Sequence, residues 1–369
     1  MDGPKPDQIE ICTFGPGFGE CSVIHLGNDN WIVVDSCLDS ETKTPVAVDY
    51  LASIKVHPSR VRMVVATHWH DDHVRGMAKQ LEVFSSAKFC ASSALTAKEF
   101  HATVIAYEER HNISVGSGAS EITKVLNILK ERAGFSTPMR ASPNRPILVL
   151  NACDTAHGLP VTVRSLSPSD KQFDLFLTQM TKLFPTALKT RTRIPDDDPN
   201  HISIALHIEV GDQAILLGAD LEENGDPELG WSAIVNSQER PQVIARVFKI
   251  PHHGSRNGHC EPVWFKMLSH DPIAVLTPYN RGRKLPSDRD IARILSQTTD
   301  AYCTSRKRFQ VRRDRSPAVL KQIRETVDRL RPLQEKTGWV RIRNDGSENP
   351  TSWSVEMSPE ACHLTDWTV

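Results

Sequence analysis

Three histidines and two aspartates fall within the six residues from His68 to His73. An apolar run at residues 63–66 precedes them and predicts a short buried strand. His68 and His70 are two residues apart, so an extended chain can project both to the same side. Asp72 follows where the chain turns toward a helix. Neutral imidazole and carboxylate are the usual non-thiolate ligands of zinc-like ions, so the stretch predicts a metal site.

Two later apolar strands also lead into ligand-type residues. The strand predicted at 213–217 runs into Asp220, and the strand predicted at 243–250 runs into His252 and His253. Strand ends hold side chains at fixed spacing, as a metal site requires. The whole set exceeds the three or four protein ligands of one zinc ion. Two divalent ions about 3.5–4 Å apart, zinc or else manganese, would use the set with Asp220 as the bridge.

Such a pair of ions makes a water molecule more acidic and clamps an oxygen of a phosphodiester or carbonyl group. A serine or cysteine nucleophile is then unnecessary, and the Gly-x-Ser-x-Gly signature of covalent catalysis is absent from the sequence. We therefore expect hydrolysis by activated water, and we assign the catalytic roles to Asp72 and Asp220. Asp35 ends a further predicted strand, and it either orients a metal ligand or caps a turn.

The elements around these residues predict one domain over residues 1–369, with a helical insertion at about 96–145 and a helix-strand extension at about 307–369. Strands alternate with helices predicted at 45–54, 74–81, 173–183 and 287–296, and a loop is predicted at 136–146. This order fits an α/β fold, a four-layer αββα sandwich with mixed sheets. A hydrophobic content of 39% and a charged content of 24% are ordinary for a globular protein.

The cysteines and the apolar runs bear on the compartment. Eight cysteines are scattered along the chain without a Cys-x-x-Cys pair, which favours a reduced, cytoplasmic setting. The amino terminus is polar and has no signal-peptide core. The longest apolar runs, at 146–150 and 214–219, are too short to span a bilayer, so we expect no membrane association.

The spacing His-x-His-x-Asp-His, formed by His68, His70, Asp72 and His73, resembles the signature of the metallo-β-lactamase fold hydrolases. Further segments resemble one branch, which contains the cytoplasmic hydrolase domain of the ComEC competence proteins and its free-standing relatives. These segments are residues 14–20, 31–35, 200–206, 216–220 and 250–255. The resemblance covers most of residues 8–306. It implies that His68 and His70 hold one ion, that Asp72, His73 and His253 hold the other, and that Asp220 bridges them.

The sequence leaves three residue roles open. Many members of the family supply a third histidine to the first ion, and His201 is the nearest candidate here. His252 competes with His253 as a ligand, although a role as partner of a ligand suits it better. The branch also tends to place Gly-His-Pro after an asparagine in a late loop. Here Asn280 is followed by Lys284, which would have to replace the missing histidine.

A basic segment at residues 281–315 bears on the substrate. It holds eleven Lys or Arg and four Asp, a net charge of +7 in a chain whose total is −1. Clustered cations beside a two-metal cleft favour a polyanion, and a solvated charged face is the alternative. The leading hypothesis is a phosphodiesterase or nuclease acting on DNA or RNA. The alternatives are a hydrolase of a small ester, lactone or nucleotide signal, and a metal-binding module that depends on a protein partner.

Overall fold

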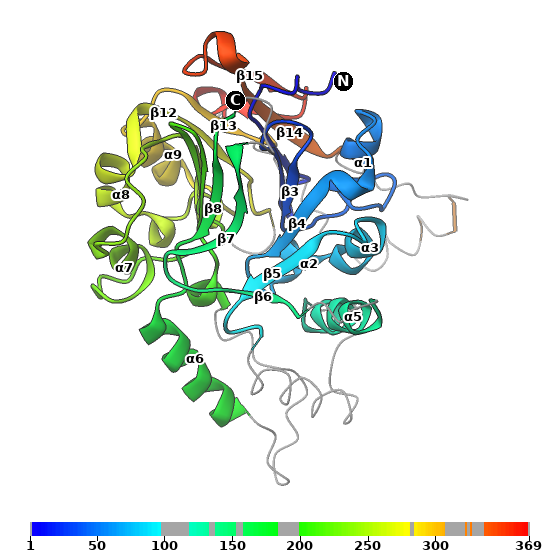
Figure 1. The fold of residues 1–369 in the computed structure, drawn as a ribbon, viewed down its shortest axis with the longest axis vertical. Helices are drawn as coiled ribbons and strands as arrows, with labels where there is room; N and C mark the ends of the chain where they lie inside the picture. Colours follow the sequence, from blue (N-terminus) through cyan, green and yellow to red (C-terminus); the bar gives the residue numbers. More distant parts are fainter. Residues whose placement is uncertain are drawn as a thin grey trace.

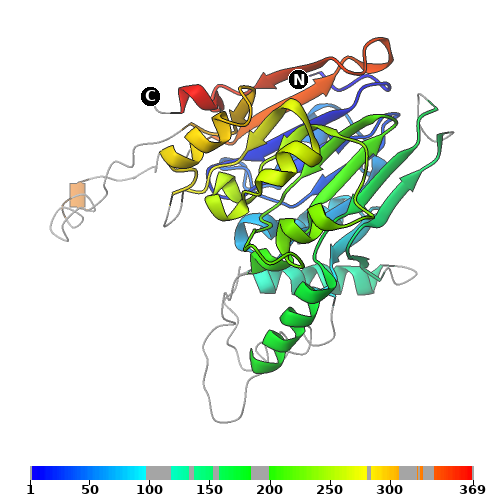
Figure 2. The same ribbon diagram turned by 90° about the vertical axis from the view of Figure 1, so that its left-hand side faces the viewer.

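Two eight-stranded sheets lie face to face, and helices cover their outer faces (Figure 1). The computed structural model describes residues 2–96, 118–132, 137–152, 158–183, 199–280, 284–306, 322, 325–326 and 336–367. Seen from the side, the two sheets form adjacent layers with helices outside each (Figure 2). The four-layer αββα sandwich predicted from the order of elements is confirmed.

The first sheet has the strand order β15-β14-β1-β2-β3-β4-β5-β6. Its strands are β1 (Glu10–Gly15), β2 (Cys21–His25), β3 (Trp31–Val34), β4 (Val61–Ala66), β5 (Lys88–Ser92), β6 (Met139–Ala141), β14 (Gly338–Asn344) and β15 (Trp353–Met357). Strands β3 to β6 pair in parallel. Helices α1 (Val46–Ser53), α2 (Asp71–Val74), α3 (Met77–Val83) and α5 (Gly118–Glu131) lie in the crossovers between them. Parallel pairing brings the carboxyl ends of β3 and β4 to one edge of the sheet.

The second sheet has the order β16-β13-β12-β11-β10-β9-β8-β7. Its strands are β7 (Arg145–Leu150), β8 (Val161–Ser165), β9 (Leu206–Val210), β10 (Gln213–Leu217), β11 (Ala245–Lys249), β12 (Leu268–Leu276), β13 (Ala301–Cys303) and β16 (Cys362–His363). Strands β10 to β13 are parallel, and α7 (Gly230–Asn236), α8 (Glu261–Lys266) and α9 (Asp288–Leu295) connect them. Helix α6 (Asp170–Leu183) follows β8. The carboxyl ends of β10 and β11 therefore also share an edge.

The apolar core has three layers because successive strand residues face opposite sides of a sheet. In β3, Ile32 and Val34 point into the layer between the two sheets, whereas Trp31 and Val33 point toward the helices. The helices of the second sheet enclose a third cluster around Trp231 and Phe248. Both faces of each sheet are thus covered, which explains why β2, β3 and β10 are buried along their whole lengths.

The structure differs from the expected elements at several points. The helix predicted at 74–81 is two helices, because Gly76 adopts a left-handed φ of 87° and a Cβ there would lie 2.5 Å from Leu38 Cδ2. The loop predicted at 136–146 contains the edge strand β6 and the start of β7. Helices α7 and α8 and strands β13 and β16 were not predicted. Each has at most seven residues, too few to show a clear periodicity.

The two segments predicted as additions contribute to the sheets. The described part of 96–145 contains α5 but also β6, so this range is not a purely helical insertion. Residues 97–117, where more helix was expected, lie outside the described part. In the carboxyl-terminal range, β14 pairs with β1 and β16 pairs with β13. The helix predicted from Ser316 lies almost entirely outside the described residues. Within them, no helix has both the length and the apolar character needed to cross a bilayer.

The burial of β14 generates a stability prediction. Ile342 is fully buried in the layer between the sheets. We expect Ile342→Ala to lower the free energy of unfolding by about 2–5 kcal/mol, because the shortened side chain leaves a cavity. Val149→Ala is the control, since Val149 is 57% exposed on the edge strand β7. Urea denaturation measures both variants. An equally small loss in each would contradict the placement of β14 in the core.

Candidate metal centre

The histidine-rich segment, called the metal loop below, runs from the end of β4 through α2, and its backbone is held from two sides. Glu20 N donates a hydrogen bond of 2.9 Å to the carbonyl oxygen of Asp72. On the other side, Gly118 N donates to Asp71 Oδ1 over 2.5 Å. A Cβ at Gly118 would lie 1.7 Å from the carbonyl oxygen of Trp69, so only glycine fits at this start of α5. These contacts fix the backbone of the loop and therefore the positions of its imidazole side chains.

A first group of ligand atoms comes from the loop and from the end of β10. His68, His70 and Asp220 each offer one atom, and these atoms lie within 4.8 Å of one another. His68 Nε2 is 3.0 Å from His70 Nδ1. Burial, followed by the positive charges of neighbouring imidazoles, holds the pKa of His68 well below its ordinary value. A neutral His68 keeps a lone pair for a cation.

A second group surrounds the same carboxylate from the other side. Nε2 of His73 and Nε2 of His253 lie 3.3 and 3.4 Å from Asp220 Oδ2. Asp72 Oδ2 is 3.3 Å from His253 Nε2 and 3.8 Å from His73 Nε2. His73, His253 and Asp220 also form, with Glu20, a set of ligand atoms within 4.8 Å of one another. Asp220 is thus common to both groups, as a bridging ligand would be.

The charges of this second group depend on one another. Burial disfavours the charged imidazoles, but the carboxylates outweigh it. The net effect raises the pKa of His73 well above its ordinary value and that of His253 to about 10. Burial likewise opposes charge on Asp220, yet the two imidazolium groups hold its pKa well below the ordinary value. Without an ion, protons on His73 and His253 neutralise the carboxylates, so cation binding would release them.

The polar atoms of the site are better placed to bind a metal ion than to form hydrogen bonds with one another. His73 Nε2, His253 Nε2 and Asp220 Oδ1 are buried, and none has a hydrogen-bond partner among the described residues. Their short separations are therefore not hydrogen bonds in good geometry. Buried polar atoms are normally satisfied, and unsatisfied ones point to an ion or water. Imidazole and carboxylate are the donors that zinc accepts.

Asp35 orients His73. It follows β3 with a left-handed φ of 61°, and its Oδ2 lies 2.7 Å from His73 Nδ1. Thr67 donates to the same carboxylate from its amide and from its hydroxyl, each over 2.8 Å. An Nδ1–H donated to Asp35 leaves Nε2 of His73 free to face Asp72 and Asp220. Of the two roles considered for Asp35, the structure favours ligand orientation.

A buried ion pair that the sequence did not predict lies behind the site. Lys249 Nζ donates to both carboxylate oxygens of Glu20 over 2.5 Å, and Lys249 is only 2% exposed. Thr277 Oγ1 donates to Glu20 over 2.7 Å, and Thr277 O lies 3.0 Å from His253 Nδ1. These contacts occupy Glu20 and make it a support for His253. The available signal was a lysine inside the apolar strand 243–250.

Two histidines with open roles lie apart from both groups. His201 belongs to neither set of converging ligand atoms in the described residues. His252 Nδ1 lies 3.0 Å from Glu222 Oε1, and its side chain is 16% exposed. Asn200 and Asn257 also donate to Glu222 Oε1. The structure thus brings His68, His70, Asp72, His73, Asp220 and His253 together, and it places His252 in a neighbouring network.

Comparison with known proteins supports the fold. Residues 14–136 match the family model described as the metallo-beta-lactamase superfamily. This range contains the histidine-rich loop, and the two-sheet architecture agrees with it, so the chain has the metallo-β-lactamase fold. No curated protein matches the sequence.

Several solved structures also match, all at low identity. A metallo-β-lactamase with an HARLDQ motif from Cronobacter sakazakii is 13% identical over 65% of this chain and 70% of that one, with a TM-score of 0.32. MIM-2 metallo-β-lactamase is 17% identical over 63% of this chain and 72% of its own, with a TM-score of 0.32. The fold protein YhfI from Bacillus subtilis is 13% identical over 66% and 70%, with a TM-score of 0.31.

The shared carboxylate predicts a defect in metal binding. We expect Asp220→Asn to lower the zinc content per chain, because both ligand groups lose the same charged oxygen. Asp212→Asn is a matched control, since Asp212 is exposed at the opposite end of β10. Elemental analysis after dialysis against zinc measures the content.

In wild type, a zinc excess of 100 times the dissociation constant would add about 2.7 kcal/mol to the free energy of unfolding, and chelation would remove this stabilisation. Equal zinc in Asp220→Asn and wild type would contradict the shared site.

The buried pair predicts a large asymmetry between single and double variants. Lys249→Met leaves the Glu20 carboxylate buried and unpaired, so we expect a loss of about 3–5 kcal/mol in unfolding free energy. Replacing both residues, as Lys249→Met with Glu20→Leu, should recover much of that loss. Arg246→Met on the same strand, where the cation is only partly buried, should cost less. Urea denaturation of the metal-free proteins compares them. A single variant as stable as wild type would contradict the pair.

Proposed function

We propose that this protein is a metal-dependent hydrolase, and that it acts as a phosphodiesterase or nuclease on DNA or RNA. The observation that carries the proposal is the convergence of two segments, one after β4 and one after β11, on Asp220, which follows β10. Six imidazole and carboxylate side chains meet there. Three of their buried atoms that could bind a metal, His73 Nε2, His253 Nε2 and Asp220 Oδ1, have no hydrogen-bond partner among the described residues. A structural zinc site is normally closed at four ligands, whereas this set exceeds four.

The chain's own residues would divide the work around two divalent cations. His68 and His70 would hold one cation, Asp72, His73 and His253 the other, and Asp220 both. When bound, such a pair makes water more acidic and neutralises charge on a phosphate group. Asp35 and Thr277 orient His73 and His253, so the imidazoles need little rearrangement. This preorganisation is what electrostatic catalysis requires.

Covalent catalysis by cysteine has no support in the described residues. The seven described cysteines are free and buried. Cys260 comes nearest to a ligand in sequence, seven residues after His253, and burial raises the pKa of its thiol to about 11. Burial also raises the pKa of the Cys37 and Cys21 thiols well above the ordinary value. A reactive cysteine needs access and a lowered pKa. Water is therefore the nucleophile that this site favours.

The basic segment at 281–315 supports a nucleic-acid substrate. Of its eleven cations, Lys284, Arg289, Arg293 and Arg306 lie in the described part of the chain. Arg293 is paired with Asp290 over 2.7 Å, so it contributes little free charge. The cations of the segment other than these four lie outside the described residues. The nucleic-acid assignment therefore rests on the sequence. The resemblance of residues 250–255 to the ComEC branch points to the same class of hydrolase.

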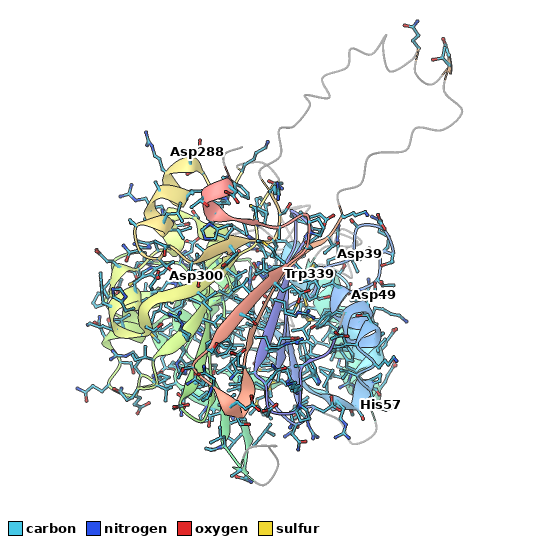
Figure 3. All side chains as sticks on the ribbon, turned by 90° about the horizontal axis from the view of Figure 1, so that it is seen from above. Asp39, Asp49, His57, Asp288, Asp300 and Trp339 are labelled. Atoms are coloured by element: carbon cyan, nitrogen blue, oxygen red, sulfur yellow. The ribbon has the colours of Figure 1, made fainter. Side chains whose placement is uncertain are left out.

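Activity assays test the proposal directly. We expect the zinc- or manganese-loaded protein to cleave DNA, RNA or a small phosphodiester such as bis(p-nitrophenyl) phosphate. His68→Ala and Asp220→Asn should reduce the rate by at least a hundredfold, roughly the loss expected when one electrostatic stabiliser is removed. His57→Ala is the control, because His57 is an exposed histidine beside α1 (Figure 3). If no phosphodiester is cleaved, or if His68→Ala matches wild type, the proposal fails.

A second assay distinguishes a nuclease from a hydrolase of small molecules. Neutralising Arg306, Lys307 and Arg308 together removes three charges from the basic segment. For duplex DNA, the salt dependence of log K should fall by roughly 0.9 for each lost phosphate contact. Cleavage of a small diester should stay unchanged. An unchanged salt dependence on DNA and RNA would favour the small-molecule alternative.

A further inference from the structure

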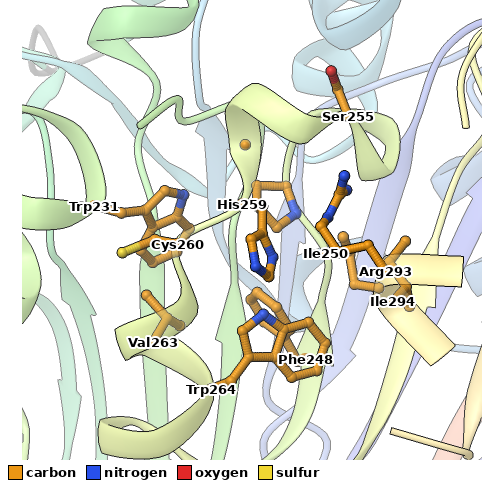
Figure 4. A pocket seen from close by; sticks show the side chains of 12 residues that line it. Trp231, Phe248, Ile250, Ser255, His259, Cys260, Val263, Trp264, Arg293 and Ile294 are labelled. Carbon is orange, nitrogen blue, oxygen red and sulfur yellow. The ribbon is translucent and has the colours of Figure 1, made fainter. Parts of the chain in front are cut away.

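Two cavities lie near the proposed metal centre, and only one is large enough for a ligand group. The cavity of about 10 Å³ between β11, α8 and α9 is lined by Phe248, Trp264 and Arg293 (Figure 4). Its volume suits one water molecule at most. The other cavity, of about 220 Å³, lies against the metal-binding loop. It borders the loop at Asp71 and Arg75, on either side of the ligands Asp72 and His73.

We propose that this larger cavity, here called the Arg75 cavity, binds an anionic group of the substrate next to the one that is hydrolysed. In a nucleic-acid strand that group is the neighbouring phosphate. The inference rests on the proposed phosphodiesterase function and names a subsite for it. Three segments line the cavity. They are the turn after β1 (Pro16, Phe18, Gly19), the loop after β3 (Cys37, Leu38, Asp39, Ser40, Lys43) and the metal loop (Asp71, Arg75).

Arg75 is the group best suited to hold the anion. Arg75 is exposed, and its guanidinium forms no hydrogen bond or ion pair with any described residue. Its backbone is fixed, because Ser36 Oγ donates to the Arg75 carbonyl oxygen over 3.0 Å. A guanidinium offers several donors in a planar fork that matches two phosphate oxygens at once. The cavity therefore has an anchored cation whose hydrogen-bonding capacity is unused.

The lining also contains two carboxylates, Asp39 and Asp71, and a second cation, Lys43. Each carboxylate keeps its charge but accepts hydrogen bonds from other groups, so neither is paired with the guanidinium of Arg75. Asp39 Oδ1 accepts hydrogen bonds from Glu41 N and Thr42 N over 2.8 and 2.9 Å. Burial opposes this charge, but the hydrogen bonds prevail and lower the pKa of Asp39. Figure 3 shows Asp39 at the side of the molecule that carries α1. Asp71 Oδ1 accepts from Gly118 N.

The position of the cavity links it to the chemistry of the site. Arg75 follows Asp72 by three residues, a separation of about 4.5 Å along a helix axis. At Gly19, a Cβ would lie 3.3 Å from the carbonyl oxygen of Asp72, so the turn after β1 packs directly on the metal loop. The cavity and the metal ligands therefore share one rigid wall. Pro16, Phe18 and Leu38 give the cavity an apolar side, which suits the sugar that connects two phosphates.

The test compares two substrates in two matched variants. Arg75→Ala removes the proposed ligand, and Arg60→Ala removes an exposed arginine that precedes β4, at the end of the strand away from the metal loop. The substrates are a single-stranded oligonucleotide and bis(p-nitrophenyl) phosphate, which has one phosphodiester and no neighbouring phosphate. For the oligonucleotide, we expect Arg75→Ala to raise KM about tenfold or more, the effect of losing one charged hydrogen-bonded contact. For the small diester, KM and kcat should not change.

A binding measurement gives a readout that is independent of turnover. In an Asp220→Asn background without metal, fluorescence anisotropy of the labelled oligonucleotide should show weaker binding for Arg75→Ala and a salt slope smaller by roughly 0.7. Arg75→Lys keeps the charge but loses the fork, so its affinity should be intermediate. Urea denaturation midpoints equal to that of wild type confirm that each variant folds.

The outcomes separate this inference from the proposed function. If neither substrate is cleaved by wild type, the phosphodiesterase proposal itself fails. If the oligonucleotide is cleaved and Arg75→Ala behaves like Arg60→Ala in KM and in binding, the subsite is overturned. If Arg75→Ala impairs both substrates equally, Arg75 acts on the metal loop, and the subsite is again overturned. A tenfold loss confined to the oligonucleotide supports it.

Discussion

The burial of Asp220 among imidazoles is the interaction on which the rest of this site depends. A carboxylate that is 2% exposed cannot remain charged without compensation. His73 and His253 provide that compensation from one side, and His68 and His70 face it from the other. Nε2 of His73 and Nε2 of His253 are buried and have no hydrogen-bond partner among the described residues. A pair of cations would satisfy the carboxylate and the imidazoles together, which is why the arrangement favours metal binding over a simple buried ion pair.

The scaffold explains how such a concentration of polar groups is tolerated. The ligands lie in short segments that directly follow the buried strands β4, β10 and β11, and Asp72 and His73 belong to the helix α2 that begins there, so the backbone has little freedom to move. A second set of contacts then fixes the rings, through Asp35 on His73 and through Thr277 on His253. Behind both lies the buried pair of Glu20 and Lys249. The pair is buried, and it joins the turn before β2 in the first sheet to the end of β11 in the second.

The same loop that carries the ligands also forms a wall of the Arg75 cavity. The proposed site for hydrolysis and the proposed site for a neighbouring anion would then be positioned by one segment, which Gly19, Gly76 and Gly118 allow to pack closely. Coupling of this kind is useful in phosphoryl chemistry, because alignment of the reacting group supplies much of the rate enhancement. It also offers a route to specificity, since a substrate without the second anion would lose the contact with Arg75.

The sequence by itself determined the fold class and most of the candidate ligands that the structure brings together around Asp220. Local sequence patterns were sufficient for this. They comprise apolar strands that alternate or are continuously hydrophobic, the His-x-His-x-Asp-His spacing, and the polar residues that follow later strands. Only the tertiary structure decided which distant residues meet. It brought Asp220 and His253 to the loop, left His201 outside, placed His252 beside Glu222, and revealed Glu20, Lys249 and Arg75 as parts of the site's surroundings. The physical reason is that local periodicity reports burial and backbone conformation. The pairing of a charge with its partner depends on chain segments more than two hundred residues apart, such as Glu20 and Lys249, and no local pattern encodes that contact.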